Sequence, residues 1–126
     1  MKERITLTES EWLLMQVLWE NGACTLRELT DAVRSETGWT PNAVISFLKR
    51  MELKQAVSVE GERRSKVYRP LLDRNETILE ETESLLSRVY RGNMHLMMQN
   101  AVRCASLTKA EADELIRLLQ QGREKL

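Results

Sequence analysis

Three helix-start signals near the beginning of the chain constrain its fold more than any other feature. Segments 8–11 and 25–28 both read Thr-x-x-Glu, a capping box in which the hydroxyl and the carboxylate each satisfy a free backbone N–H group. At the third start, Thr40 precedes a proline, whose fixed φ suits the first helical position. Gly22 and Gly38 follow the first two segments and are typical of helix ends. The sequence therefore predicts three short helices.

The third predicted helix, over residues 40–53, has one apolar and one polar face. Its apolar positions follow the i, i+3, i+4, i+7 spacing of a buried stripe and are Val44, Phe47, Leu48 and Met51. The opposite face carries amide, hydroxyl and cationic groups, on Asn42, Ser46, Lys49 and Arg50. In the helix before it, the predicted buried side consists of Leu26, Leu29, Ala32 and Val33. Two helices joined by a short turn, the second with a polar outer face, are typical of a helix-turn-helix.

After Leu53 the sequence pattern changes from helical to alternating. Val57 and Val59 alternate with polar residues, segment 60–65 is a charged tip, and an extended pattern resumes up to Pro70. This pattern predicts a β-hairpin over 57–69, although the tip lacks the Asn-Gly pair of tight turns. Three helices followed by such a hairpin make a winged helix, which we place over residues 1–70.

The charge of the chain is locally unbalanced, although its formal net charge is zero. Residues 49–69 hold seven Lys or Arg against three Asp or Glu, a local net charge of +4. Attraction to phosphate acts over short distances, so a local patch is sufficient for it. Amide and cationic side chains also match base edges in the major groove of DNA. These features predict a DNA-binding face formed by the recognition helix over 40–53 and the wing over 57–69, with candidate contacts Thr25, Thr40, Asn42, Ser46, Lys49, Arg50, Arg63, Arg64 and Lys66.

Residues 71–126 return to a helical pattern and predict three further helices. Helix starts are expected at 73–76 and 108–111, and a break at 91–93 separates two of the helices. Three helices in about fifty residues have too little interior for an independent core. We therefore expect a homodimer, with two-fold symmetry as its commonest form. The apolar positions that would cover one another are Ile78, Leu85, Leu86, Val89, Met94, Met97, Met98, Leu115, Leu118 and Leu119.

Several other function classes have little support in the sequence. His95 and the two cysteines, Cys24 and Cys104, show no metal-ligand spacing, so no metal or cofactor is expected. No Ser/His/Asp set, Gly-rich phosphate loop or paired-carboxylate motif is present, which predicts that the chain is not an enzyme. There is no apolar run of 18 residues, so no membrane insertion and a cytoplasmic location are expected.

Several motifs together resemble the penicillinase-repressor family, of the BlaI, MecI and CopY types. The first is Leu7-Thr8-Glu9-Ser10-Glu11-Trp12, followed by Val17-Leu18-Trp19. The others, in chain order, are Thr25-Leu26-Arg27-Glu28-Leu29, Gly38-Trp39, Val67-Tyr68-Arg69-Pro70 and Tyr90-Arg91-Gly92-Asn93. The resemblance covers nearly the whole chain, and the order and spacing of the motifs are more specific than any one of them.

The resemblance implies a dimeric repressor whose winged helix binds a palindromic operator and whose helical tail dimerises. It implies control of β-lactam-resistance-type or related stress genes, and release through a membrane sensor-protease or its downstream protease. In that branch cleavage follows an Asn that precedes an aromatic residue. The matching positions here are Asn100 and Ala101, so this chain departs from the pattern with alanine in place of the aromatic residue. The cysteine-rich tail of the copper-responsive branch is absent.

The recognition helix also departs from the pattern that the resemblance implies. Asn42-Ala43 stands where the resemblance implies a Thr-Thr pair, and Ile45 stands where it implies a Lys or Arg. Ala43 and Ile45 are therefore added to the candidate DNA contacts. Ile45 can pack against a thymine methyl group or extend the core contact. Gln55 replaces a glycine after the helix, so a left-handed turn there would be mildly strained.

Two alternative functions remain open at this point. The same face could bind a protein partner, which would make the chain a winged-helix adaptor. The chain could also be a thiol- or metal-responsive regulator that uses Cys24, Cys104 and His95.

Overall fold

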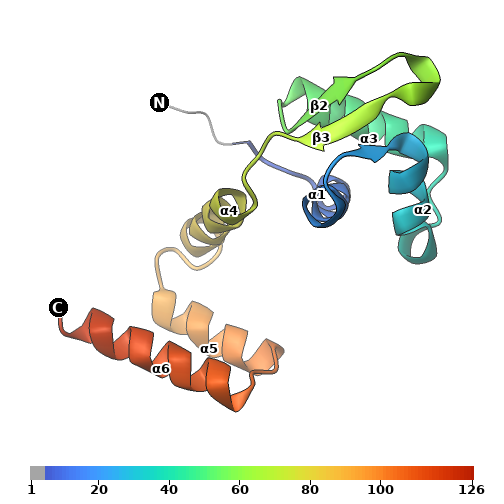
Figure 1. Ribbon diagram of the computed structural model, residues 1–126. Helices are drawn as coiled ribbons and strands as arrows, with labels where there is room; N and C mark the ends of the chain where they lie inside the picture. The colour runs from blue at the N-terminus through green and yellow to red at the C-terminus, as the bar shows by residue number, and fades with distance from the viewer. Residues whose placement is uncertain (1–4) are drawn as a thin grey trace. The chain divides into compact units, whose positions relative to one another are not determined.

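The computed structural model describes residues 5–126, apart from the side chain of Arg64. The chain divides into two compact units, Met1–Glu80 and Glu81–Leu126. Along the chain the elements are α1 (Glu9–Asn21), β1 (Cys24–Thr25), α2 (Leu26–Thr37), α3 (Pro41–Leu53), β2 (Val57–Glu60), β3 (Val67–Pro70), α4 (Arg74–Arg88), α5 (Met94–Cys104) and α6 (Lys109–Arg123) (Figure 1). The predicted fold class, mainly α with a small β-hairpin wing, is confirmed.

The predicted helix starts are present with the hydrogen bonds that define them. The N–H of Glu11 donates to Thr8 Oγ1 at 3.3 Å, and the N–H of Thr8 donates to Glu11 Oε1 at 2.9 Å. The start of α2 repeats this reciprocal pair between Thr25 and Glu28. At the start of α3, Thr40 Oγ1 accepts from a first-turn N–H group at 3.2 Å. These bonds each span three residues, which is why the sequence alone could predict them.

The core of the first unit is centred on α1, which packs against α2, α3 and β3. The largest fully buried apolar side chains come from the three helices and β2, and are Leu14, Met15, Leu18, Leu29, Val33, Val44, Leu48, Met51 and Val57. The prediction for α2 was wrong at Ala32, which is exposed, whereas Thr30 is buried. At about 100° per residue, Ala32 lies roughly 100° from the centre of the buried stripe. Thr30 is compatible with burial because its hydroxyl donates to the Leu26 carbonyl oxygen at 2.8 Å.

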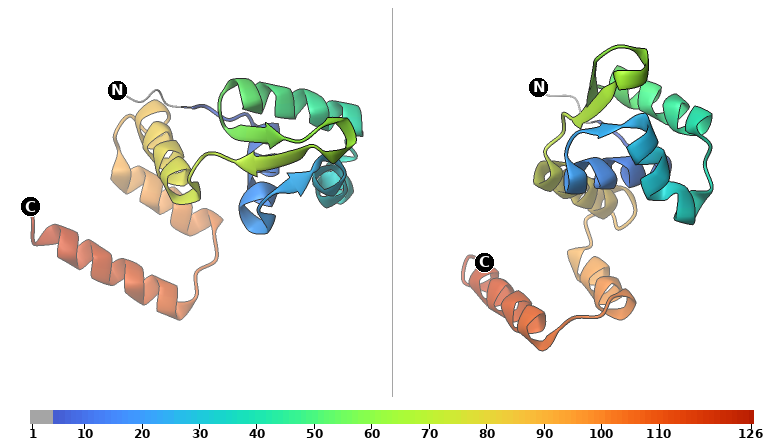
Figure 2. Two further views of the ribbon diagram at one scale, coloured as in Figure 1. Left: turned by 45° about the horizontal axis from the view of Figure 1, so that its top comes forward. Right: turned by 45° about the vertical axis from the view of Figure 1, so that its right-hand side comes forward.

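The sheet has three antiparallel strands in the order β1-β3-β2. The predicted hairpin is confirmed, with Val57 opposite Pro70 and Glu60 opposite Val67. Its tip contains a short 3₁₀ turn over Arg63–Ser65. Figure 2 shows the hairpin running alongside α3, with its tip toward the N-terminal end of that helix. The wing lies beside the side of α3 that carries Ile45, Lys49 and Glu52.

The start of α4 belongs to the first unit. Trp19 Nε1 donates to the Leu72 carbonyl oxygen at 3.0 Å, and Leu72 packs against the core. Thr77 is buried, and its hydroxyl donates to the Asp73 carbonyl oxygen. The predicted helix start at 73–76 has one capping bond, from the Glu76 N–H to Asp73 Oδ2 at 3.0 Å. These contacts keep the first turns of α4 with the winged helix.

The second unit contains the end of α4 together with α5 and α6. Neither α5 nor α6 has a buried residue. The predicted capping box of α6 is present, with Thr108 Oγ1 accepting from the Glu111 N–H at 3.1 Å. Helix α5 begins after Asn93, whose Oδ1 accepts from the Leu96 N–H at 3.0 Å. Local hydrogen bonds define these two helices, while their apolar faces stay open to solvent.

Candidate nucleic-acid interface

Helix α3 presents its polar side chains to solvent. Its inward positions Val44, Leu48 and Met51 are fully buried, and Phe47 is half-buried. Most of the predicted DNA contacts on this helix are exposed, namely Thr40, Asn42, Ser46, Lys49 and Arg50, whereas Ala43 and Ile45 are half-buried. Polar groups therefore form a continuous stripe along the outside of α3.

One flank of α3 holds a stack of two aromatic rings and a guanidinium. The rings of Trp39 and Phe47 have centroids 4.8 Å apart and are tilted by 58°. The guanidinium carbon of Arg50 lies 5.2 Å from the centroid of the Phe47 ring. A cation over an aromatic face is attracted by the quadrupole of the ring. This contact restricts the orientation of Arg50 on the outer surface of the helix.

The other flank of α3 borders a groove of about 550 Å³, which we call the α2–wing groove. The groove is lined by Thr25, Leu26, Arg27, Ile45, Lys49, Glu52, Val59, Arg63, Lys66 and Tyr68. It brings together five of the predicted contacts, from three separate segments of the chain: Thr25, Ile45, Lys49, Arg63 and Lys66. The remaining contacts on α3 lie outside its lining, and the side chain of Arg64 lies outside the described residues.

The threonines at the helix starts use their side chains for capping. The hydroxyl oxygens of Thr25 and Thr40 each accept a bond from a backbone N–H of the helix that follows. The backbone N–H and the hydroxyl of Thr25 lower the pKa of Glu28, whose carboxylate accepts from that N–H. Burial and the nearby charge of Glu52 raise the pKa of Tyr68 in the wall of the groove. The tyrosine therefore stays a neutral hydroxyl at physiological pH.

Arg27 lines the groove but was not among the predicted contacts. In the sequence it stands between Thr25 and Glu28, and these two residues alone account for the capping box. In the structure its side chain is 92% exposed and lies in the same groove as three cations from α3 and the wing. No local signal could have identified Arg27, because the groove forms only when three segments fold together.

Comparisons with known proteins identify the family of this chain. The penicillinase repressor family model matches residues 7–121. The chain belongs to this family. It is 26% identical over 125 residues to the penicillinase repressor of Bacillus licheniformis, covering 99% of this chain and 98% of that protein. It is 17% identical over 115 residues to the methicillin resistance regulatory protein MecI of Staphylococcus aureus, covering 91% and 94% respectively.

Solved structures of the repressor BlaI resemble part of this chain. The DNA-binding domain of the repressor BlaI in solution has a TM-score of 0.53 and 25% identity, covering 60% of this chain and 93% of that chain. The monomeric form of Bacillus licheniformis BlaI in complex with the blaP half-operator has a TM-score of 0.51 with the same identity and coverage. The penicillinase repressors are a family of repressors rather than enzymes, so the predicted lack of enzymatic activity is confirmed.

Half of the predicted dimerisation residues are exposed to solvent, and the other half are half-buried. Leu85, Val89, Met94, Leu118 and Leu119 are exposed, while Leu86, Met97, Met98 and Leu115 are half-buried. Ile78 is half-buried and lies in the first unit. An apolar groove of about 510 Å³ runs between α5 and α6, with Met98, Val102, Leu115, Ile116 and Leu119 among its lining residues.

The candidate cleavage position lies inside a regular helix. Asn100 and Ala101 are both within α5, and Asn100 is half-buried. The Nδ2 of Asn100 donates to the Tyr90 hydroxyl at 3.3 Å. The peptide bond between Asn100 and Ala101 is therefore held in helical geometry.

The cysteines and histidine of the alternative sensor function are not clustered. Within residues 5–126, no group of three or more His, Cys, Asp or Glu side chains could hold a metal ion. Cys24 is buried, and burial together with the charge of Glu28 raises the pKa of its thiol. Cys104 is exposed. No helix in the described part of the chain has the length and apolarity needed to cross a bilayer.

Proposed function

We propose that this chain is a homodimeric transcriptional repressor that binds a palindromic operator through α3 and the wing. The observation that supports this proposal best is the exposed polar stripe of α3, which lies beside a groove with four cationic side chains in its lining, Arg27, Lys49, Arg63 and Lys66. The BlaI complex with a half-operator, to which the first unit is similar, supports the same mode of binding. Residues 1–70 would form the DNA-binding domain and residues 71–126 the dimerisation domain.

In the proposed complex, α3 and the wing contact different parts of the DNA. The outer stripe of α3, from Asn42 to Arg50, would enter the major groove, where amide and guanidinium groups can pair with base edges. The wing, through Arg63, Arg64 and Lys66, would contact the neighbouring sugar-phosphate backbone. Ala43 and Ile45 leave few polar groups at the first turns of α3, so thymine methyl groups are the base features that suit them.

A second copy of the chain is the proposed cover for the apolar faces of α5 and α6. Val102, Ile116 and Leu118 are 57%, 52% and 51% exposed, so each has about half of its surface in water. Contiguous apolar surface of this kind normally marks an interface. Two-fold pairing would place two copies of α3 on successive major grooves, with half-sites about 34 Å apart.

Release of the operator by proteolysis is part of the proposal. A protease needs an extended segment, so cleavage between Asn100 and Ala101 would require α5 to open locally. A membrane sensor-protease or its downstream protease would supply the cleavage, and the genes controlled would be of the β-lactam-resistance or related stress type. The repressor itself would act in the cytoplasm.

The DNA-binding proposal is tested by fluorescence anisotropy with the full chain and labelled DNA. The probe is a palindrome from the DNA upstream of the chain's own gene, titrated at several salt concentrations against a scrambled duplex. We expect site-specific binding that weakens with salt, and Lys49→Ala should reduce the magnitude of the salt slope by about 0.9. Lys125→Ala, which removes an exposed charge from the chain's end, should leave the slope unchanged. Equal affinity for the palindrome and the scrambled duplex at moderate salt would contradict the proposal.

The dimer is tested separately by sedimentation equilibrium. Leu119 is 62% exposed and lines the apolar groove, so Leu119→Glu should convert the dimer to a monomer. Gln121→Glu adds the same charge at an exposed polar position of α6 and should leave the dimer intact. A wild-type chain that is monomeric at micromolar concentration would contradict this part of the proposal.

A further inference from the structure

The α2–wing groove contains a cluster of cations, of which Lys49 alone belongs to the recognition stripe of α3. Its lining has one basic side chain from α2, one from α3 and two from the wing, against a single carboxylate, Glu52. Counting full charges on these lining residues, the groove carries a net charge of +3. Such a concentration of cations in a concave surface attracts anions more strongly than the same charges on a flat one.

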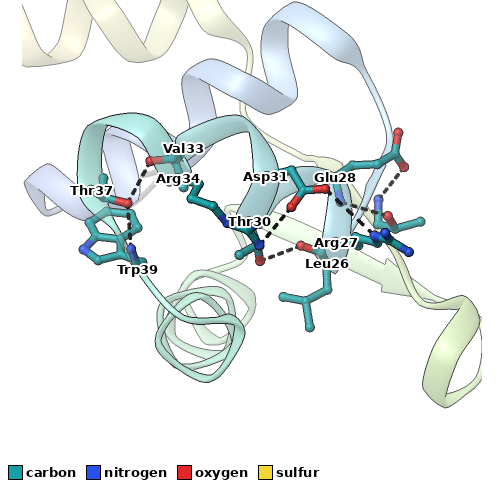
Figure 3. A network of polar contacts seen from close by, with 10 residues as sticks. Leu26, Arg27, Glu28, Thr30, Asp31, Val33, Arg34, Thr37 and Trp39 are labelled. Atoms are coloured by element: carbon teal, nitrogen blue, oxygen red, sulfur yellow. Dashed lines mark hydrogen bonds and ion pairs between the residues drawn. The ribbon is translucent and has the colours of Figure 1, made fainter.

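Among the described residues, Arg27 is the one member of this cluster that has an ion-pair partner, and that pair is weak. Its Nε lies 3.9 Å from Asp31 Oδ2, at the outer limit of an ion pair, and both side chains are exposed. The other oxygen of Asp31 lies 3.0 Å from Arg34 Nη2, so the carboxylate is bound more closely by the next arginine along α2 (Figure 3). An exposed pair at 3.9 Å stabilises very little. The guanidinium of Arg27 is therefore available for an external anion.

The other cations of the groove are also available. Among the described residues, Lys49, Arg63 and Lys66 form no ion pair, and all three are exposed. The groove also has an apolar wall, which includes Leu26, Ile45 and Val59. A ligand that matches both the cations and the apolar wall has a negative charge next to a small apolar group.

We propose that the α2–wing groove binds a phosphate of the DNA backbone, with Arg27 as a direct phosphate contact beside Lys49 and Lys66. This inference rests on the proposed function and names a contact that lies outside the recognition helix and the wing. The planar guanidinium can bind a phosphate with two parallel N–H donors, a geometry that lysine lacks. The apolar wall suits the deoxyribose that carries the phosphate. Arg27 thus adds affinity without reading sequence.

The test measures the salt dependence of DNA binding by Arg27→Ala and a matched control. Arg34→Ala removes the same charge from the same helix, but Arg34 lies outside the groove and is paired with Asp31. We expect Arg27→Ala to reduce the salt slope by about 0.9 and to weaken binding to the palindrome and to the scrambled duplex by the same factor. Arg34→Ala should leave both slope and affinity unchanged, and Arg27→Lys should restore the slope.

The outcomes separate this inference from the proposed function. If Arg27→Ala keeps the wild-type slope while Lys49→Ala lowers it, the phosphate contact of Arg27 is wrong and DNA binding stands. If the wild-type chain binds the palindrome and the scrambled duplex equally at moderate salt, the proposed function itself fails.

A second arm distinguishes backbone phosphate from free phosphate. Calorimetric titration with inorganic phosphate and with pyrophosphate should give no saturable binding to the chain at millimolar concentration. Saturable binding that Arg27→Ala abolishes, together with an unchanged DNA salt slope, would assign the groove to a free anion and overturn the inference.

Discussion

The Nζ of Lys54 lies 2.5 Å from Oε1 of Glu11, a carboxylate that is fully buried. The same Nζ donates to the Thr6 carbonyl oxygen at 2.8 Å, and Glu11 Oε1 also accepts from the Thr8 N–H. Lys54 follows directly on α3, whereas Glu11 belongs to the first turn of α1. One ion pair therefore joins the end of the proposed recognition helix to the start of the helix at the centre of the core.

We expect Lys54→Met to destabilise the first unit by about 2–4 kcal/mol. The substitution keeps the apolar stem but leaves the Glu11 carboxylate buried without a counter-charge, which is the costly way to break such a pair. Urea unfolding followed by circular dichroism measures the loss. The double variant Glu11→Gln, Lys54→Met has no uncompensated charge and should be more stable than Lys54→Met alone. If the double variant lost as much stability as Glu11→Gln and Lys54→Met together, the two residues would not be coupled.

The same pair predicts a dependence of stability on acid. Burial raises the pKa of Glu11, but the hydrogen bond and charge of Lys54 and the Thr8 N–H lower it more, so that it lies below the ordinary value of 4.5. A carboxylate with a depressed pKa in the folded state stabilises the fold above its unfolded pKa, and this contribution is lost as the pH falls through the folded value. The free energy of unfolding should therefore fall more steeply below pH 4.5 in the wild type than in Glu11→Gln. Parallel curves for the two proteins would show that another group carries the acid dependence.

Gln55→Gly should stabilise the chain by about 0.5–1 kcal/mol. Gln55 has a φ of 63°, in the left-handed region where glycine has no steric penalty and other residues do. Its side chain is exposed, so the substitution removes no core contact. Gln55→Ala keeps the Cβ atom and should give no gain. Thermal unfolding measures both, and a destabilised Gln55→Gly would mean that its glutamine side chain has a structural role.

Gly61→Ala should disrupt the wing. Gly61 has a φ of 95°, and a Cβ atom there would lie 2.5 Å from the Ser65 carbonyl oxygen, a contact that the backbone can relieve only by moving. Gly38→Ala is the control, since Gly38 has a φ of 67° but no atom within 4 Å of a Cβ. Both variants should lose about 1 kcal/mol to left-handed strain, with a larger loss for Gly61→Ala. In the anisotropy assay only Gly61→Ala should also weaken DNA binding, and equal effects of the two variants would contradict a role for the wing.

Phe47 and Arg50 should be coupled in DNA binding. If the Phe47 ring orients the guanidinium 5.2 Å away, Phe47→Leu should weaken operator binding by about 0.5–1 kcal/mol when Arg50 is present. The same change should have little effect in an Arg50→Ala background. A double-mutant cycle in the anisotropy assay gives the coupling energy, and a value of zero would show that the stack serves only the packing of Trp39.

Much of the fold was predictable because its signals are local. The two Thr-x-x-Glu starts of the first unit, the apolar stripe of α3 and the alternation of the hairpin each depend on residues a few positions apart. The family resemblance places Gln55 where a glycine is common, and its φ of 63° lies in the left-handed region that favours glycine. The candidate contacts on α3 could be selected because one helical period decides which side chains face outward. Their contact with DNA stays a prediction.

Other features depend on contacts between distant segments, which no local pattern encodes. Strand β1 has two residues, too few for alternation to be visible, and it exists because Cys24 and Thr25 pair with β3. The partners of the Glu11–Lys54 pair are 43 residues apart, and those of the Trp19–Leu72 bond are 53 residues apart. Arg27 joins the cations of α3 and the wing only after three segments have packed around one core. Short-range hydrogen bonding and periodicity thus define the elements, whereas burial and charge pairing between distant residues define the groove in which we propose that DNA binds.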